Sequence, residues 1–230
     1  MNLAIVGYGK MGRLIEHLAP EYGSSVKLRL DVDNNANFEG MTADNFRGID
    51  AAIEFSTPGS AVENIERLAK LKVNAIVGTT GWFDQIPRAR AAVERAGTAL
   101  VWGANFSVGV SVFSQVVAEA ARLMSRQPEY GAWAWEIHHA AKKDAPSGTL
   151  LALVERMQKA GYEKRIDTGS NRAGAHPGTH EVGFDSAADT ITIRHTARSR
   201  EGFARGALRA AQWIAGKKGF YEFREIVNEL

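Results

Sequence analysis

The sequence predicts an α/β protein, in which a domain with a parallel sheet is joined to a second, α+β domain with a mixed or antiparallel sheet. Two observations predict this class. Over the first hundred residues short apolar runs alternate with amphipathic segments, and after about residue 105 apolar residues begin to alternate singly with smaller or polar ones. Strands that alternate with helices form parallel sheets through right-handed crossovers, whereas singly alternating strands form sheets with one buried face.

Five near-continuous apolar runs predict the parallel strands, because strands covered by helices on both faces are apolar throughout. They span residues 3–6, 26–32, 51–55, 73–77 and 98–102. Apolar residues spaced at helical intervals predict the helices between these strands. The first helix carries Met11, Leu14, Ile15 and Leu18 on one face, the second carries Ala61, Ile65, Leu68 and Ala69, and the third covers residues 87–95.

The second half predicts a helix over residues 108–124 and strands over residues 130–139, 179–184 and 190–196, with a turn at 185–189. Trp133, Trp135 and Ile137 share one face of the first of these strands, and we expect that face to be buried. Glycines and a proline in residues 167–178 predict a mobile loop. Ala207, Leu208, Ala211 and Ala215 recur at helical spacing, and we expect this last helix to pack back on the first domain. The predicted first domain therefore comprises residues 1–106 and 207–230, and the predicted second domain comprises residues 107–206.

Composition excludes several classes of protein. The 230 residues contain no cysteine, which removes disulfides, thiolate metal sites and cysteine nucleophiles. No apolar stretch is long enough for a membrane span, and the chain begins with a strand-like run instead of a secretory signal. The net charge of +2 is spread along the chain, so a nucleic-acid partner is not indicated. We expect a cytoplasmic protein.

A glycine motif follows the first predicted strand and begins the first helix. Gly7-Tyr8-Gly9-Lys10-Met11-Gly12 is a G-x-G-x-x-G sequence, typical of a Rossmann-like domain that binds a dinucleotide. Gly7 permits the tight turn, Gly9 lets the backbone approach a pyrophosphate, and Gly12 lets helix and strand pack closely. The pyrophosphate would lie at the helix N-terminus, where free N–H groups and the dipole favour anions.

An acidic residue at the end of the second strand bears on the choice of coenzyme. Asp31 is placed to accept hydrogen bonds from the adenosine ribose, and no arginine follows it to receive a 2′-phosphate. The sequence therefore predicts that NADH is used at least as well as NADPH. The alternative is that Asp33 contacts the ribose while Asp31 caps a turn. Two further segments, Phe55-Ser56-Thr57-Pro58 and Gly78-Thr79-Thr80-Gly81, end strands at the edge where such sheets bind ligands.

The densest group of chemically active side chains lies in residues 136–149, E-I-H-H-A-A-K-K-D-A-P-S-G-T. A helix is predicted to begin at Pro146 or Ser147, and its first N–H groups suit a carboxylate. Lysines at 142 and 143 add positive charge, and histidine is the side chain best suited to give a proton near neutral pH. Together they predict a pocket for a small polyanion that also receives a proton.

Strand alternation favours one of the two histidines. His138 shares a face with Glu136 and has the same parity as Lys142, whereas His139 falls on the tryptophan face unless the strand ends before it. Three other interpretations compete with this site. The two lysines could be an ordinary solvated surface, the tryptophans are core more often than a stacking platform, and a metal could be held by a set drawn from His138, His139, Asp144, His176 and His180.

The run from Glu136 to Thr149 resembles the signature of the 4-hydroxy-tetrahydrodipicolinate reductases, E-x-H-H-x-x-K-x-D-A-P-S-G-T, with every fixed position matched. The glycine motif, the GTTG segment, residues 105–109 and residues 200–207 resemble the family in the same order. The resemblance implies reduction of the dihydrodipicolinate-type intermediate to tetrahydrodipicolinate with NADH or NADPH, in lysine and diaminopimelate biosynthesis. It also implies a homotetramer built through the second domain, which binds the substrate.

The resemblance also implies roles for individual residues. His138 would be the proton donor and Lys142 the second catalytic group, while the substrate carboxylates would be bound by His139, Gly148 and Thr149. The dinucleotide would be bound by Gly7, Tyr8, Gly9, Lys10, Met11, Gly12, Asp31, Gly78, Thr79, Thr80, Gly103, Ala104, Asn105 and Phe106. No metal is implied.

The chain departs from the family pattern in three places. It is short, its turn at 185–189 replaces a stretch that usually carries a G-E pair, and alanines fill positions 140 and 141, where many members have an arginine or histidine. Lys143 is a possible substitute for that side chain. Two other functions remain open from the sequence: another Rossmann reductase, such as an aspartate or homoserine dehydrogenase, and a non-catalytic NAD(H)-binding sensor.

Overall fold

A computed structural model describes all residues, 1–230, and the chain divides into two compact units. Unit 1 comprises Met1–Val108 and Glu201–Leu230, and unit 2 comprises Gly109–Arg200. None of the helices combines the length and the apolar character that crossing a membrane requires.

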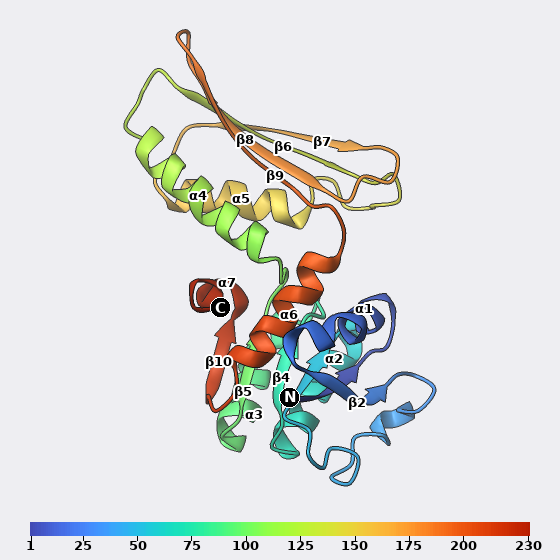
Figure 1. The fold of residues 1–230 in the computed structure, drawn as a ribbon. Coiled ribbons are helices and arrows are strands. Elements are labelled where there is room, and N and C mark those ends of the chain that lie inside the picture. Colours follow the sequence, from blue (N-terminus) through green and yellow to red (C-terminus); the bar gives the residue numbers. More distant parts are fainter. The chain divides into compact units, whose positions relative to one another are not determined.

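Unit 1 contains a six-stranded sheet in which every strand pair is parallel (Figure 1). The strand order is β10-β5-β4-β3-β1-β2, so the chain reverses its direction of travel across the sheet after β2. In sequence order the strands are β1 (Asn2–Val6), β2 (Ser25–Leu30), β3 (Ala51–Glu54), β4 (Asn74–Val77), β5 (Ala99–Trp102) and β10 (Gly219–Glu222).

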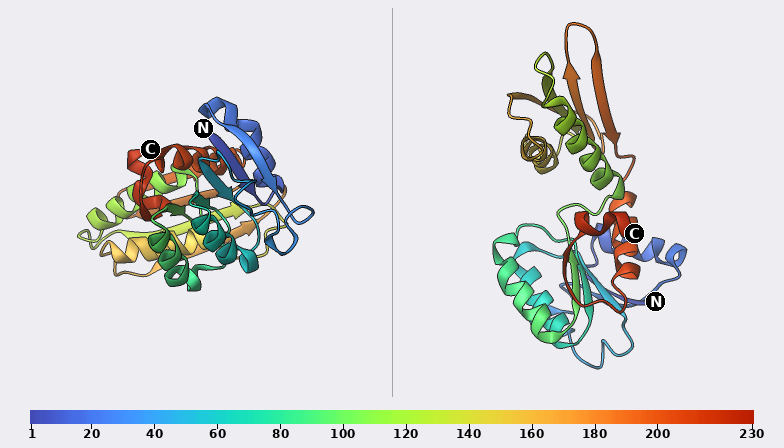
Figure 2. Two further views of the ribbon diagram at one scale, coloured as in Figure 1. Left: turned by 90° about the horizontal axis from the view of Figure 1, so that it is seen from below. Right: turned by 90° about the vertical axis from the view of Figure 1, so that its left-hand side faces the viewer.

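Helices cover both faces of this sheet, as Figure 2 (right) shows. Alternate residues of β1 point to opposite faces: Leu3 and Ile5 pack with the first helical layer, whereas Ala4 and Val6 pack with the second. The first layer contains α1 (Lys10–Leu18), α6 (Glu201–Trp213) and α7 (Phe223–Ile226), and the second contains α2 (Pro58–Lys70) and α3 (Ile86–Ala96). Four short 3₁₀ helices complete unit 1: Ala19–Tyr22, Ala36–Phe38, Phe83–Gln85 and Val227–Glu229.

The predicted parallel sheet is confirmed, and each predicted strand lies within two residues of its expected position. Several features of unit 1 were not predicted, among them the short helix α7, strand β10 and the start of helix α6. Strand β10 is only four residues long, too short for a recognisable apolar run. Helix α6 begins at Glu201, six residues before the first residue of the predicted helical period. The glycine at 206 obscured this start, and it is required because a Cβ there would lie 1.7 Å from the Phe106 carbonyl oxygen.

Unit 2 contains a four-stranded mixed sheet in the order β7-β6-β8-β9, with two helices against one face (Figure 1). The pair β6·β7 is parallel, and the pairs β6·β8 and β8·β9 are antiparallel. The elements are α4 (Val108–Met124), β6 (Gly131–His138), α5 (Gly148–Lys159), β7 (Ile166–Arg172), β8 (Thr179–Asp185) and β9 (Thr190–Thr196).

The prediction that Trp133, Trp135 and Ile137 form the buried face of β6 was wrong. The buried residues are the alternate ones, beginning with Ala132 and Ala134, which pack against α4 and α5. The indoles are half-buried on the opposite face. They lie over glycines of the neighbouring strands. A Cβ at Gly183 would lie 2.2 Å from the Trp133 ring, and one at Gly169 would lie 3.1 Å from the Trp135 ring, so the glycines make room for the two indoles.

The prediction of a mobile loop over residues 167–178 was also wrong for its first half. Residues up to Arg172 belong to β7, which pairs with β6 along its whole length. The strand was missed because it lies at the edge of the sheet, where polar residues such as Thr168 and Asn171 are exposed, and because Gly169 makes room for Trp135. Residues 173–178 connect β7 to β8 without regular structure.

Candidate active site

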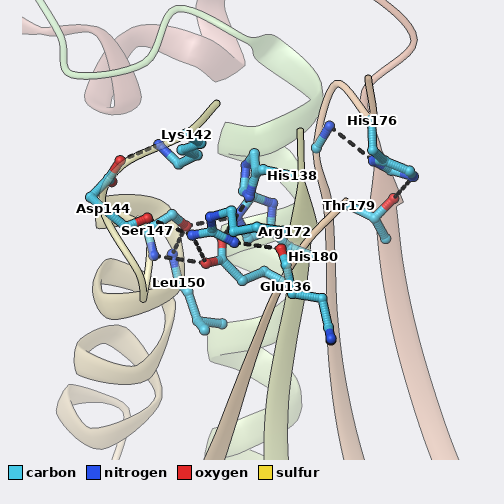
Figure 3. Close-up of polar contacts among 12 residues, drawn as sticks. Glu136, His138, Lys142, Asp144, Ser147, Leu150, Arg172, His176, Thr179 and His180 are labelled. Carbon is cyan, nitrogen blue, oxygen red and sulfur yellow. Dashed lines mark hydrogen bonds and ion pairs between the residues drawn. The ribbon is translucent and has the colours of Figure 1, made fainter. Parts of the chain in front are cut away.

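Strand β6 places Glu136 and His138 on the buried face of the unit 2 sheet, at the end of the alanine row (Figure 3). The Glu136 side chain is fully buried, and that of His138 is 11% exposed. The predicted parity of the two residues is therefore present in the structure, although the face they share is the buried one. A buried acid and a buried imidazole side by side are the elements of a proton-transfer site.

Glu136 is held by two donors from other elements. Its Oε1 accepts a hydrogen bond from the Ser147 backbone N–H at 2.8 Å and another from the Arg172 guanidinium at 2.8 Å. Burial by itself would raise the pKa of Glu136, but the hydrogen bonds from Ser147 and Arg172 outweigh it and lower the pKa to about 2. Glu136 is therefore a carboxylate at neutral pH.

The Glu136 carboxylate lies against the ring of His138. Its Oε2 is 2.9 Å from Nδ1 of His138, although the two groups are not oriented for a hydrogen bond. Burial lowers the pKa of His138 below the ordinary value of 6.5, and Lys142 and Arg172 lower it further, while Glu136 raises it. On the other side of the ring, a Cβ at Gly178 would lie 2.9 Å from Nε2. Any larger residue at 178 would therefore press on the imidazole near Nε2.

A second histidine lies beside the first. His180 of β8 pairs across the sheet with Glu136, its ring centroid is 5.1 Å from that of His138, and its Nε2 is 3.2 Å from the Ser147 hydroxyl. Burial lowers the pKa of His180 to about 4, and the neighbouring His138 contributes, so the ring is neutral above that pH. The same Ser147 hydroxyl accepts a hydrogen bond from the Leu150 N–H and caps α5.

The two predicted catalytic residues and the predicted carboxylate site come from neighbouring parts of unit 2. Lys142 lies in the loop after β6, where its Nζ is 2.8 Å from Asp144 Oδ1. Gly148 and Thr149 form the first turn of α5, directly after Ser147. The N–H of Gly148 donates to the Asp144 carboxylate, and together with Lys142 it lowers the pKa of Asp144, so this helix N-terminus already binds a carboxylate of the chain itself. His139 is half-buried and follows the last residue of β6, so the strand ends before it, while Lys143 is exposed.

Three residues of this site were missing from the predicted set of functional residues: Glu136, Arg172 and His180. Glu136 was noted only for its shared parity with His138. Arg172 was hidden in the segment taken for a loop, and His180 was considered only as a metal ligand. Their meeting point depends on strand register, since Glu136 pairs with Ser170 of β7 and with His180 of β8.

The residues of the candidate metal set do not gather as a group. Nδ1 of His176 accepts a hydrogen bond from the Gly178 N–H at 3.2 Å, and Asp144 forms an ion pair with Lys142. His180 does lie near His138, and with Glu136 the three offer atoms within 4.8 Å of one another. Arg172 already supplies the positive charge on that carboxylate.

Unit 1 contains a groove of about 410 Å³ at the carboxyl ends of β1, β2 and β3. Gly7 turns the chain at φ 93°, and a Cβ there would lie 2.2 Å from the Phe55 carbonyl oxygen. Gly9 is the N-cap of α1, and no protein atom lies within 4 Å of the position a Cβ would take. Gly12 packs against Gly7, since a Cβ at Gly12 would lie 2.5 Å from the Gly7 carbonyl oxygen. The groove is lined by Val6, Gly7, Gly9, Leu30, Asp31, Val32, Asn35, Ala36, Asn37, Phe38, Phe55, Ser56, Thr57, Ser60 and Asn64.

The other residues of the motif occupy different surroundings. Tyr8 donates its hydroxyl proton to Glu16 and lies under the guanidinium of Arg13, while Lys10 is exposed and Met11 packs partly into the core. Asp31 lines the groove directly after β2, whereas Asp33 does not line it. This difference favours Asp31 over Asp33 as a ligand of anything bound there.

Two further predicted segments end neighbouring strands of the same sheet. Gly78, Thr79 and Thr80 follow β4; Thr79 is buried, and its hydroxyl accepts a hydrogen bond from the Ser56 N–H at 2.7 Å. Gly103, Ala104 and Asn105 follow β5. Phe106 packs its ring into the core against Phe223, with centroids 4.6 Å apart, so the ring is not available to a ligand.

Comparison with known proteins identifies the family. The family model described as dihydrodipicolinate reductase, N-terminus, matches residues 1–106, and the model described as dihydrodipicolinate reductase, C-terminus, matches residues 109–227. The chain belongs to the dihydrodipicolinate reductase family. Two similar relatives are 4-hydroxy-tetrahydrodipicolinate reductases, from Christiangramia forsetii (34% identical, covering 100% of this chain and 99% of the relative) and from Archaeoglobus fulgidus (35% identical, covering 99% and 100%).

Solved structures give the same fold. A dipicolinate-bound dihydrodipicolinate reductase from Paenisporosarcina sp. TG-14 matches with a TM-score of 0.79 at 20% identity, covering 100% of this chain and 99% of that one. An aspartate dehydrogenase from Thermotoga maritima matches with a TM-score of 0.52 at 15% identity, covering 94% and 97%. The family match, and not the shared fold, separates this chain from the dehydrogenases that remained open from the sequence.

Proposed function

We propose that this chain is an NAD(P)H-dependent oxidoreductase that reduces 4-hydroxy-tetrahydrodipicolinate, or its dehydrated form dihydrodipicolinate, to tetrahydrodipicolinate in lysine and diaminopimelate biosynthesis. The observation that carries the proposal is the buried Glu136–His138 pair, next to Lys142 and the N-terminus of α5, in a chain of the dihydrodipicolinate reductase family. This arrangement suits a small dicarboxylate that must receive a proton.

The residues of unit 2 divide the chemistry between them. Lys142 and the N–H groups of Gly148 and Thr149 bind the substrate carboxylates in place of Asp144, whose carboxylate occupies Lys142 and the Gly148 N–H in the free chain, and His139 adds a further contact. His138 donates the proton from Nε2, the nitrogen that faces away from Glu136. The Glu136 carboxylate, 2.9 Å from Nδ1, stabilises the imidazolium by its charge before the proton leaves, as a carboxylate does for a catalytic histidine elsewhere.

The residues of unit 1 fit a nicotinamide dinucleotide. Gly9 leaves open space at the N-terminus of α1, where a pyrophosphate gains N–H donors and a favourable dipole. Asp31 accepts from the adenosine ribose, and the segments at Gly78, Thr79, Thr80 and Gly103–Phe106 border the nicotinamide end. When bound, the coenzyme supplies the hydride.

Activity with the product of dihydrodipicolinate synthase, followed by oxidation of NADH and NADPH in parallel, tests the reaction. We expect turnover with this substrate and none with oxaloacetate and ammonia. Replacing His138 with Gln should lower kcat by roughly 10²–10⁴-fold while NADH binding is retained, since general acid catalysis contributes about that factor. His17, an exposed histidine of α1, gives the matched control, H17Q, with wild-type kcat. Near-wild-type kcat in H138Q would remove His138 from the mechanism.

We propose that NADH is the preferred coenzyme or is used equally well. Asp31 lines the groove, and its negative charge disfavours a 2′-phosphate. Replacing Asp31 with Ala should raise the KM for NADH roughly tenfold or more, because hydrogen bonds to a charged group contribute about 1.5–3 kcal/mol. The variant D33A is the matched control and should leave this KM unchanged. Equal effects of the two substitutions, or a strong wild-type preference for NADPH, would contradict the proposal.

We also propose a cytoplasmic homotetramer assembled through the sheet of unit 2. The support is the half-exposed tryptophan face of β6, which neither α4 nor α5 covers. Light scattering after size-exclusion chromatography should give four times the 25.0 kDa chain mass. Replacing Trp133 with Arg on that face should shift the mass to a smaller species, and a wild-type monomer would contradict the assembly.

A further inference from the structure

Glu54 is a buried carboxyl in unit 1 that has no part in the chemistry described above. It is the last residue of β3, follows the core residues Ala51, Ala52 and Ile53, and is 0% exposed. A carboxyl buried without a cation costs stability, and an apolar residue of similar size would serve the fold as well or better. A buried titratable group beside a groove is therefore a candidate for a functional role.

The contacts of Glu54 join three segments of unit 1. Its Oε1 accepts hydrogen bonds from the Ser56 N–H at 3.2 Å, from the Ser56 hydroxyl, and from the Asn64 side-chain amide at 3.2 Å. The Ser56 N–H is shared with the Thr79 hydroxyl oxygen at 2.7 Å. One carboxyl thus links the segment after β3, helix α2 and the segment after β4.

Two of these partners line the groove. Ser56 and Asn64 form part of its wall, with Asp31 and Gly9 among the other lining residues. Two buried atoms of the cluster, Oε2 of Glu54 and Oδ1 of Asn64, have no hydrogen-bond partner within the chain. The cluster therefore has polar capacity that the fold itself does not use.

The groups that contact Glu54 are uncharged. Burial raises the pKa of Glu54, and the hydroxyls of Ser56 and Thr79 and the amide of Asn64 oppose this only in part. The uncharged form is thereby favoured. Beside a groove that already contains the Asp31 carboxylate, an uncharged Glu54 accepts hydrogen bonds from Ser56 and Asn64 without adding a second negative charge near the pyrophosphate of a dinucleotide.

We propose that Glu54 is a positioning residue for coenzyme binding, which holds Ser56 and Asn64 in the wall of the groove and, through Ser56, fixes Thr79 of the segment after β4. This inference rests on the coenzyme role proposed above for the groove. It concerns binding of the dinucleotide and not the proton transfer in unit 2.

Calorimetric titration of NADH into the wild-type enzyme and three variants tests the proposal, with kcat measured at saturating NADH. Replacing Glu54 with Leu removes the acceptor for both partners and should raise the Kd for NADH about tenfold or more, since at least two hydrogen bonds are lost. The kcat at saturation should change by less than about threefold, because unit 2 is untouched. Replacing Glu54 with Gln keeps an uncharged acceptor and should restore most of the affinity.

Thr98 provides the matched control. It is a buried polar residue that directly precedes β5, so it lies at the amino end of a strand that does not border the groove, and T98V should leave the Kd unchanged. Thermal unfolding checks that each variant is folded; if E54L is not, Glu54→Asp, whose carboxyl is one methylene further from Ser56, should raise the Kd in its place. Wild-type affinity in a folded E54L or E54D, or equal weakening in E54Q and E54L, would overturn the proposal. Failure of the wild-type enzyme to bind NADH would instead refute the coenzyme role of the groove.

Discussion

Two glutamates, one in each unit, are both fully buried on strands, and their surroundings shift their pKa values in opposite directions. Glu136 of β6 receives a guanidinium and a backbone N–H, which hold its pKa at about 2 against the effect of burial. Glu54 of β3 receives only hydroxyl, amide and backbone donors, and burial raises its pKa. Glu136 thus has strong hydrogen bonds from Ser147 and a cationic partner in Arg172, whereas no cation contacts Glu54.

In the proposed mechanism, glutamate serves both the proton-transfer site of unit 2 and the coenzyme groove of unit 1, in different charge states. A carboxylate beside His138 supports the proposed role of this residue as the proton donor, because a neighbouring negative charge stabilises an imidazolium. An uncharged carboxyl is useful beside the groove of unit 1, because it accepts hydrogen bonds without repelling an anionic coenzyme. Predictions that separate the two glutamates therefore test the account of both sites.

The largest expected effect comes from removing the cation. Replacing Arg172 with Met leaves the Glu136 carboxylate buried without its charged partner, which should lower the free energy of unfolding by about 3–5 kcal/mol. Urea unfolding at neutral pH measures it. Arg165, whose ion pair with Asp167 is exposed, gives the control R165M, expected to cost less than about 1 kcal/mol. Similar losses in the two variants would show that Glu136 does not depend on Arg172.

A smaller effect separates the kinetic roles proposed for Glu136 and Glu54. Replacing Glu136 with Gln should lower kcat roughly 10–100-fold, with little change in the Kd for NADH, because the imidazolium of His138 loses a neighbouring negative charge, and a charge so close typically favours protonation by about that factor. Glu54→Leu should show the reverse signature, a higher Kd with a smaller change in kcat. Steady-state kinetics and calorimetry on the same preparations distinguish them. A raised NADH Kd in E136Q would merge the two sites and contradict this division.

The smallest expected effect is a difference in pH between the decline of kcat and the decline of kcat/KM. The proton donor must be protonated, so activity falls as the pH rises past the pKa of His138, which burial lowers below 6.5 in the free enzyme. A bound dicarboxylate favours the imidazolium, so the decline of kcat should lie at higher pH than the decline of kcat/KM. Profiles measured with saturating NADH check this order. The same decline in H138Q would assign it to another group.

Much of unit 1 could be predicted from the sequence, because its information is local. The strands are continuous apolar runs, and the glycine motif specifies a turn, a cap and a close packing contact within six residues. Strand β10 was not predictable in this way, since four residues carry too little pattern. The cluster around Glu54 depends on contacts with Asn64 and Thr79, which sequence spacing does not indicate.

Unit 2 was harder to predict, because its site depends on register between strands far apart in the chain. The parity of Glu136 and His138 followed from strand alternation alone. Their burial did not, since the large tryptophans suggested the wrong face, and the helices pack against alanines instead. Arg172 and His180 reach Glu136 only through pairing of β7 and β8 with β6.

The most direct test of the contrast between the two glutamates is a pH titration of their carboxyl carbons by NMR, in protein labelled with ¹³C at the glutamate side chain. The signals are assigned by their loss in E54Q and E136Q. The Glu136 signal should stay ionised as the pH falls through 4.5, the ordinary value for glutamate, and the Glu54 signal should titrate above the exposed glutamates. Titration of both signals on the same side of the exposed glutamates would contradict the account.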